Sequence, residues 1–141
     1  MHILLLHGPN LNLLGTREPE VYGSMSQDEL VAQVKQAAQH FGMQFSFIQS
    51  NHEGVLIDSL QQTTADVVLF NPAAYSHTSI ALMDTVRAIA VPVVEVHLSD
   101  ISTRERYRQF SYIKDVSVAS FMGHHLQSYL DALTYIKENY S

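Results

Sequence analysis

Two polar side chains in one long loop form the pair best suited to proton chemistry in this sequence. Arg17 and Tyr22 lie in the stretch 7–23, together with Asn10 and several glycines and prolines that favour turns. A guanidinium close to a phenol oxygen favours the phenolate, which is a usable general base near neutral pH. The residues alone leave two alternatives open, because Tyr22 can also pin the loop by its ring and Arg17 can pair with a neighbouring glutamate.

A histidine at the end of an apolar run is the candidate for the complementary acid. His97 follows the sequence Val-Val-Glu-Val, and Glu95 lies two residues before it, on the same face of an extended strand. Imidazoles change charge between about pH 5 and 8, so His97 can give a proton to a leaving hydroxyl while Glu95 holds the other ring nitrogen. The alternative is a buried histidine that only satisfies local backbone groups.

A second set of residues is suited to bind a small anion that carries hydroxyl groups. Leu98 and Ser99 offer successive backbone N–H groups, and Ser99 adds a hydroxyl, which suits a carboxylate. The neutral donors and the fixed cation available for ring hydroxyls are Asn71, His77 and Arg108.

The sequence lacks the signatures of several other kinds of site. It contains neither a dinucleotide fingerprint nor a Walker loop, and no serine stands in a G-x-S-x-G turn. Its lysines lie away from the expected site, which disfavours imine catalysis. The 8 histidines show no H-x-x-x-H or H-E-x-x-H spacing, so we expect neither a metal nor another cofactor.

Composition narrows the setting of the protein. The chain has 141 residues, 46% of them hydrophobic, which fits one domain, residues 1–141, with a single sizeable core. A net charge of -6 argues against binding of nucleic acid, and no apolar run approaches the roughly 20 residues of a membrane span. The first residues lack the pattern of a signal peptide and the chain has no cysteine, so we expect a cytoplasmic protein without membrane contact.

Hydrophobic periodicity predicts the elements that must position these residues. Short apolar or alternating runs indicate strands at residues 3–6, 45–47, 67–70, 91–96 and 116–121. Helical patterns lie between and after them, at residues 26–42, around 56–60, at 79–90 and at 126–136. This alternation predicts an α/β fold, a flavodoxin-like three-layer sandwich with a five-stranded parallel sheet of order 2-1-3-4-5 and helices on both faces.

The predicted topology brings the polar candidates to one edge of the sheet. In such a sheet, ligands bind beyond the carboxyl ends of the strands. Polar residues follow the first four predicted strands at this end, namely His7 and Asn10, residues 51–53, Asn71 and His77, and His97 and Ser99. Clusters that are distant in sequence therefore converge on one rim, which favours a binding site over chance.

Several segments of the chain carry a resemblance to a known family. They are HGPNLNLLGTREPEVYG at 7–23, QSNHEG at 49–54, NPAAYSHTS at 71–79, VPVVEVHLSD at 91–100 and RERYRQFS at 104–111. In this order and spacing they resemble type II 3-dehydroquinate dehydratase of the shikimate and quinate pathways. The resemblance covers essentially the whole chain.

This resemblance implies a reaction and the residues that carry it. The reaction is a metal-free and cofactor-free anti elimination of water from 3-dehydroquinate to 3-dehydroshikimate through an enolate, on the way to chorismate and the aromatic amino acids. In that picture Tyr22, activated by Arg17, takes a proton alpha to the ring ketone. Asn10 and an ordered water stabilise the enolate, and His97 protonates the departing C1 hydroxyl.

The resemblance also implies how the substrate and the subunits are held. The family's substrate-binding positions correspond to Asn71, His77, Leu98, Ser99 and Arg108. Asp84 corresponds to a position that reaches into a neighbouring subunit's site, within a dodecamer built as a tetramer of trimers. The loop 7–23 corresponds to a lid that closes over the ligand and excludes water.

Two positions depart from the family's pattern. Many members have Asn where this chain has His7, and Asn where it has Asp100. A carboxylate next to Ser99 weakens the binding of an anion unless it points away or pairs with an arginine such as Arg104. Arg104 itself is expected at the surface or at a subunit contact.

Two functions of other classes stay open beside the enzyme. A flavodoxin-like carrier or nucleotide-binding module needs no catalysis, but the missing phosphate-binding loop argues against it. An assembly protein that kept the fold and lost the activity predicts that Tyr22→Phe changes nothing measurable.

Overall fold

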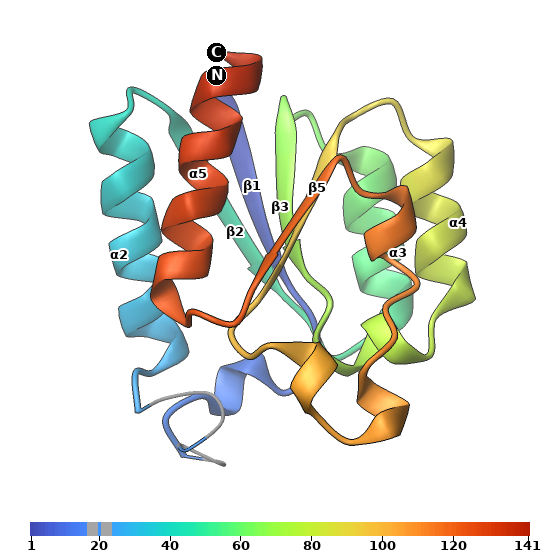
Figure 1. Cartoon of the computed structure of the whole chain (residues 1–141). Coiled ribbons are helices and arrows are strands. Elements are labelled where there is room, and N and C mark those ends of the chain that lie inside the picture. Colours follow the sequence, from blue (N-terminus) through green and yellow to red (C-terminus); the bar gives the residue numbers. More distant parts are fainter. Residues whose placement is uncertain (17–19, 21–23) are drawn as a thin grey trace.

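The computed structural model describes residues 1–16, 20 and 24–141. Arg17 and Tyr22, the predicted activator and general base in the long loop, lie outside the described residues. The described part forms a parallel sheet with helices on both faces (Figure 1). None of the helices in this part of the chain combines the length and the apolarity that crossing a membrane requires.

The sheet has five parallel strands in the order β2-β1-β3-β4-β5. Their bounds are β1 His2–His7, β2 Gln44–Gln49, β3 Val67–Asn71, β4 Val93–His97 and β5 Ala119–Met122. Strands β3 and β4 are buried along their whole length, as expected where helices cover both faces. Strand β2 lies at an edge and has exposed residues, as its alternating pattern indicates. The predicted strand order is confirmed.

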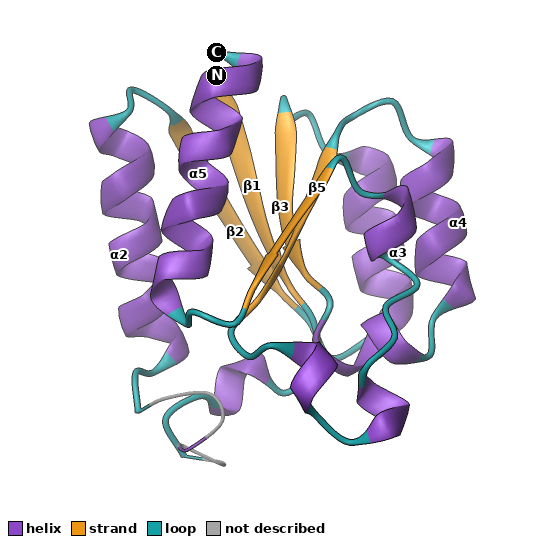
Figure 2. Cartoon of the chain, viewed as in Figure 1, coloured by secondary structure: helices purple, strands orange, loops and turns teal. Residues whose placement is uncertain are grey.

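The outer layers consist of α2 (Gln27–His40), α3 (Glu53–Gln62), α4 (Ile80–Ala88) and α5 (Leu126–Tyr140). Helices α2 and α5 cover one face of the sheet, and α3 and α4 cover the other (Figure 2). Each pair encloses its own apolar cluster against the strands. Helix α2 begins after Ser26, whose hydroxyl accepts a hydrogen bond from the backbone N–H of Glu29 at 3.1 Å and so caps the helix.

The predicted bounds of two strands were wrong. Residues 116–118 alternate like a strand, but the N–H of Val116 donates to the carbonyl of Ile113 and closes the 3-10 helix Lys114–Val116. Strand pairing resumes at Val118, whose N–H donates to the carbonyl of Val93. Strand β4 begins at Val93 rather than at residue 91, because Pro92 has no N–H to give to the ladder.

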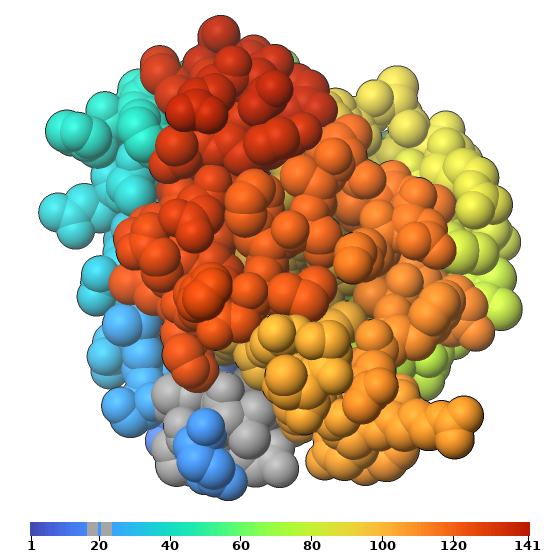
Figure 3. Space-filling model, viewed as in Figure 1, coloured from blue at the N-terminus to red at the C-terminus, as the bar shows by residue number. Residues whose placement is uncertain are grey.

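The strands end together at the edge of the sheet opposite the two chain termini (Figure 1). Short 3-10 helices follow at this edge, among them Leu11–Leu13, Ala73–His77 and Ile101–Thr103. In the space-filling view, the segment after β4 (amber) lies at the lower right of the face shown (Figure 3). Among the described residues predicted for the site, Asn10, Asn71 and His97 lie at this edge.

Candidate active site

The ends of β1 and β3 approach each other closely at the edge of the sheet. The N–H of Gly8 donates to the carbonyl of Asn71 at 2.8 Å, and a Cβ on Gly8 would lie only 2.4 Å from the carbonyl oxygen of Pro72. Only glycine fits this contact. The chain then turns at Asn10, which has a left-handed φ of 68° and donates its N–H to Asn51 Oδ1 at 3.0 Å. These contacts hold Asn10 and Asn71 in the wall of one pocket.

This pocket has a volume of about 100 Å³ and lies beyond the ends of β1, β3 and β4. Its walls consist of Pro9, Asn10, Leu11, Leu14, Asn71, Ala73, Ala74, His77, His97, Leu98, Ile101, Arg104 and Arg108. The polar groups are two carboxamides, two imidazoles and two guanidiniums, set between apolar side chains. Such a wall suits a compact anion with hydroxyl groups. The predicted site residues that the structure brings together here are Asn10, Asn71, His77, His97, Leu98 and Arg108.

His97 ends β4 and contacts a fully buried carboxylate. Its Nε2 lies 2.8 Å from Glu95 Oε2, and Glu95 is 0% exposed. Two hydroxyls complete the surroundings of this carboxylate, because Ser111 Oγ donates to Oε2 and Ser120 Oγ donates to Oε1, each at 2.5 Å. The predicted contact between Glu95 and His97 is confirmed.

The donors around Glu95 keep its carboxylate ionised. Burial by itself raises the pKa of the Glu95 carboxyl, but the hydrogen bond and charge of His97 and the two serine hydroxyls outweigh burial, so this pKa lies below its usual value. A carboxylate can only accept, so Nε2 of His97 carries a proton. Nδ1 is therefore the ring nitrogen able to exchange a proton with a ligand in the pocket.

His77 is a second, half-buried imidazole in the pocket wall. Its Nδ1 donates to the carbonyl of Phe110 at 2.7 Å. Burial lowers the pKa of His77, the hydrogen bond to Phe110 raises it in part, and the charges of His97, Arg108 and Arg104 lower it further. The net lowering favours a neutral ring, whose Nε2 is an acceptor for a ligand hydroxyl.

Two guanidiniums give the pocket its positive charge. Nε of Arg108 lies 3.3 Å from Glu105 Oε2, and its Cζ lies 5.4 Å from the centre of the Tyr107 ring. Nη1 of Arg104 donates to Ser99 Oγ at 3.3 Å, and the Arg104 side chain is only 13% exposed. The prediction of a surface position for Arg104 was wrong, because the 3-10 helix Ile101–Thr103 turns the chain back so that Arg104 lines the pocket.

Of the predicted site residues that the structure describes, two do not line the pocket of this single chain. Ser99 lies beside it and contacts the Arg104 guanidinium, whereas Asp84 is exposed on α4. The carboxylate of Asp100, which follows Ser99, is bound by its own loop. Its Oδ1 accepts from the N–H and the hydroxyl of Ser102, at 3.0 and 2.6 Å. The hydrogen bonds from Ser102 lower the pKa of Asp100. Its carboxylate therefore caps the following 3-10 helix and takes no part in the pocket wall.

Other residues that shape the site were missed by sequence reasoning. Ser111 ends the segment RERYRQFS but was given no role, and Ser120 lies outside all the segments that carry the family resemblance. Tyr129 offered a signal, because a phenol on the apolar face of a helix needs a polar partner when it is buried. Its hydroxyl lies 2.9 Å from Asn71 Nδ2 and 2.9 Å from His7 Nε2. In the described ranges, no three side chains of the metal-binding kinds gather in a way that would hold an ion.

The fold and the pocket define an α/β protein whose site holds groups able to exchange protons and to bind an anion. The sequence model of the family described as Dehydroquinase class II matches residues 1–137. The chain therefore belongs to the class II dehydroquinase family.

Individual relatives agree with this assignment. The 3-dehydroquinate dehydratase of Geotalea daltonii is 49% identical over 132 residues, which cover 92% of each chain. That of Pectobacterium atrosepticum is 48% identical over 134 residues, or 94% of this chain and 89% of the relative. The crystal structure of type II dehydroquinase from Propionibacterium acnes superposes with a TM-score of 0.93 at 34% identity, covering 98% of this chain and 97% of the other. The predictions of the family, of a flavodoxin-like fold and of a dehydratase are confirmed.

Proposed function

We propose that this chain is a 3-dehydroquinate dehydratase, which forms 3-dehydroshikimate by metal-free and cofactor-free anti elimination of water. The observation that carries the proposal is the His97–Glu95 pair at the wall of a pocket lined by Arg104 and Arg108. An acid held by a buried carboxylate, next to cationic and neutral donors, suits the loss of a hydroxyl from a hydroxylated carboxylate. Relatives named 3-dehydroquinate dehydratase, nearly half identical to the chain, support the same substrate.

The first step assigns the base to Tyr22, with Arg17 as its activator. The phenolate takes a proton from the carbon alpha to the ring ketone, and the electron pair of that bond forms an enolate. Asn10 and a water molecule stabilise the enolate oxygen by hydrogen bonds. Support for Asn10 comes from its position in the pocket wall, fixed by the bond of its N–H to Asn51.

The second step uses His97 as the general acid. In its doubly protonated form, His97 gives the proton on Nδ1 to the C1 hydroxyl as the carbon–oxygen bond breaks, and water leaves. The electron pair of the enolate then forms the new double bond of the product. Glu95 keeps its contact with Nε2 throughout, and its negative charge stabilises the imidazolium before transfer.

The substrate is proposed to bind through the remaining polar groups, with His77 as an acceptor and the others as donors. The backbone N–H groups and hydroxyl at Leu98 and Ser99 take the carboxylate, and Asn71, His77 and Arg108 bind the ring hydroxyls. We also propose that Asp84, exposed on α4, completes the site of a neighbouring subunit in a dodecamer made as a tetramer of trimers. The setting we propose is the shikimate pathway in the cytoplasm, on the way to chorismate.

Absorbance of the product tests the reaction. Dehydration creates a conjugated enone, so a 3-dehydroquinate solution treated with chelator-washed protein should gain ultraviolet absorbance. Tyr22→Phe should lower kcat by about 10²-fold or more while the fold stays intact, because general base catalysis is lost. Tyr140→Phe, at the opposite end of the molecule, is the matched control. Absence of turnover by folded wild-type protein, or a Tyr22→Phe variant as active as wild type, would contradict the proposal.

A further inference from the structure

A chain of buried hydrogen bonds runs from the start of α2 to the pocket. Gln27 Oε1 lies 2.9 Å from His7 Nδ1, and His7 Nε2 lies 2.9 Å from the Tyr129 hydroxyl. The same hydroxyl lies 2.9 Å from Nδ2 of Asn71, which lines the pocket. His7 and Tyr129 are each 0% exposed and Asn71 is 2% exposed. The mechanism above makes no use of His7 or Tyr129.

A backbone donor fixes the direction of every bond in this chain. The N–H of Ala73 donates to Asn71 Oδ1 at 3.0 Å, so the other end of the Asn71 amide is the NH2 group, which donates to the Tyr129 oxygen. The phenol hydrogen then goes to His7 Nε2, and the hydrogen on Nδ1 goes to Gln27 Oε1. Each donor therefore meets one acceptor.

The side chains in this row of hydrogen bonds stay neutral at physiological pH. Burial lowers the pKa of His7 to about 4, an effect that the hydrogen bond to Gln27 only partly offsets. Burial also raises the pKa of Tyr129, against the hydrogen bond from Asn71. A neutral His7 with its proton on Nδ1 must accept at Nε2, which requires Tyr129 to donate to His7 and to accept from Asn71.

This arrangement leaves one N–H of Asn71 for a ligand. The Nδ2 atom carries two hydrogens, and within the described residues one of them has a protein acceptor, the Tyr129 oxygen. Oδ1 is occupied by Ala73, so the amide presents a donor rather than an acceptor to the pocket. Without the Tyr129 oxygen, the Asn71 amide keeps its bond from the N–H of Ala73 but loses the second contact that holds it in this orientation.

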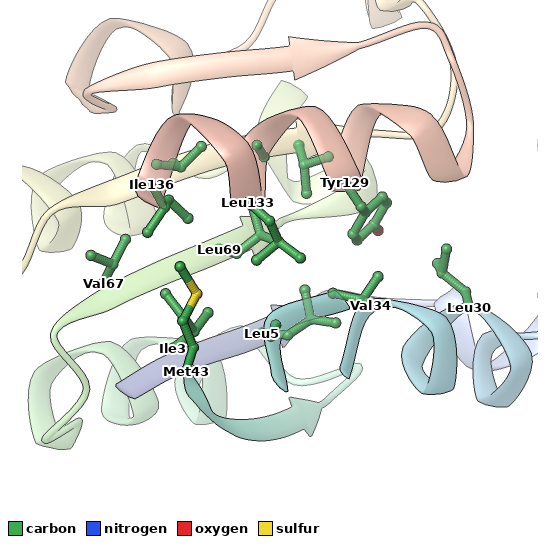
Figure 4. Packing of buried hydrophobic residues seen from close by; sticks show 14 of the residues in the cluster. Ile3, Leu5, Leu30, Val34, Met43, Val67, Leu69, Tyr129, Leu133 and Ile136 are labelled. Atoms are coloured by element: carbon green, nitrogen blue, oxygen red, sulfur yellow. The ribbon is translucent and has the colours of Figure 1, made fainter. Parts of the chain in front are cut away.

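The Tyr129 hydroxyl is separable from the packing of its ring. The ring stands between α5 and the sheet, in the apolar cluster that includes Leu5, Leu69 and Val34, and its oxygen lies at the end directed away from Leu133 and Ile136 (Figure 4). The ring of His7 packs edge-on against that of Tyr129, with 5.8 Å between centroids. A phenylalanine at 129 keeps the apolar contacts and removes only the hydrogen-bonding atom.

We propose that His7 and Tyr129 are positioning residues, which hold the Asn71 amide with its N–H toward the ligand and so select an oxygen acceptor at that point. The proposal rests on the proposed function in one respect, that Asn71 binds the substrate. It assigns a role to His7 and to Tyr129, neither of which the proposed mechanism uses, and Tyr129 lies outside the segments that carry the family resemblance.

Steady-state kinetics with 3-dehydroquinate test the role of Tyr129. Tyr129→Phe should raise KM about fivefold to tenfold and leave kcat within about twofold, because the lost contact serves ground state and transition state alike. Tyr135→Phe, on the same helix with its hydroxyl 3.5 Å from the carbonyl of Val118, should leave KM unchanged. In an Asn71→Ala background, Tyr129→Phe should change KM no further. An unchanged KM in the single variant, or an equal rise in the Asn71→Ala background, overturns the proposal.

Two substitutions at His7 separate its hydrogen bond from its shape. His7→Phe keeps a ring but removes the acceptor for the Tyr129 hydroxyl, and it should raise KM as Tyr129→Phe does. His7→Gln can place an oxygen near the position of Nε2, so its KM should stay closer to wild type. Equal KM values for His7→Phe and wild type overturn the role of His7.

Nitrogen-15 NMR of the histidine rings tests the direction of the bonds without substrate. The wild-type spectrum at pH 7 should show His7 with a protonated Nδ1 and an unprotonated Nε2, and Tyr129→Phe should shift the Nε2 resonance. The opposite tautomer in the wild type overturns the inference. Failure of the proposed function looks different, since wild-type protein would then show the predicted tautomer but no turnover of 3-dehydroquinate.

Discussion

Two buried histidines, His7 at the end of β1 and His97 at the end of β4, occupy similar places but have partners of different charge. Both are almost fully buried, at 0% and 5% exposure, and both bind a polar side chain through Nε2. The partner of His97 is the ionised carboxylate of Glu95, whereas the partner of His7 is the neutral phenol of Tyr129. One histidine is thus set beside a negative charge and the other is set in a neutral chain.

The difference shows how the partner decides what an imidazole can do. The acid role proposed for His97 relies on a carboxylate at hydrogen-bond distance, which holds one ring nitrogen as a donor and leaves the other for the ligand. Burial without a charge keeps His7 neutral, so it can only orient its neighbours. The buried carboxylate needs several donors to offset its desolvation, and Glu95 has them in His97, Ser111 and Ser120.

Removal of the charge at Glu95 should produce the largest effect. Glu95→Gln keeps the size of the side chain but no longer stabilises a protonated His97, so kcat should fall by about 10²-fold. Steady-state turnover of 3-dehydroquinate measures this loss, with exposed Glu138→Gln as the control. If Glu95→Gln retains wild-type kcat, the contrast between a histidine beside a carboxylate and a histidine beside a phenol has no functional meaning.

Acidification should reveal the neutral state of His7 in the free energy of unfolding rather than in turnover. The unfolded chain protonates His7 near pH 6.5, but the folded chain does so only near pH 4, where burial has lowered the pKa. The unfolded state therefore binds more protons between these values, and stability falls as the pH falls through that window. From pH 7 to 4.5 the His7 contribution to this loss should be about 2 to 3 kcal/mol.

Urea unfolding of wild type and His7→Gln at both pH values measures this contribution. The variant cannot titrate at position 7, so its free energy of unfolding should decrease less on acidification. Parallel losses in the two proteins would show that His7 is not the neutral group described here.

Removal of the Ser120 hydroxyl should produce the smallest effect, a modest loss of stability. Its Oγ donates to Glu95 Oε1, whereas Ser111 Oγ also accepts from the N–H groups of Ile113 and Lys114, so Ser120→Ala is the cleaner variant. Loss of this donor should cost about 1 kcal/mol of stability at pH 7 and raise the pKa of Glu95.

The pH dependence of the stability lost in Ser120→Ala tests this explanation. The depressed pKa of Glu95 contributes stability that is present above the unfolded pKa and is lost as the pH falls through the folded one. Urea unfolding curves of Ser120→Ala and wild type should therefore converge on acidification. A difference that stays constant with pH would assign the serine to packing alone.

Sequence reasoning was most successful where a contact follows from local periodicity. Successive side chains alternate across a strand, so Glu95 and His97 share a face of β4 and their contact was predicted. The same kind of pattern, apolar strands alternating with amphipathic helices, predicted the strand order and the rim on which Asn10, Asn71 and His97 meet. It failed at residues 116–118, where a 3-10 turn has the same alternation as a strand.

The sequence by itself therefore determined the fold, the edge that holds the site and the pairing of His97 with Glu95. Only the tertiary structure decided that Arg104 lines the pocket and that Asp100 turns to Ser102. It also decided that the final helix delivers a phenol to His7, across 122 residues of chain. Periodicity fixes which face a side chain takes, but the distance between groups from different elements depends on how the layers pack.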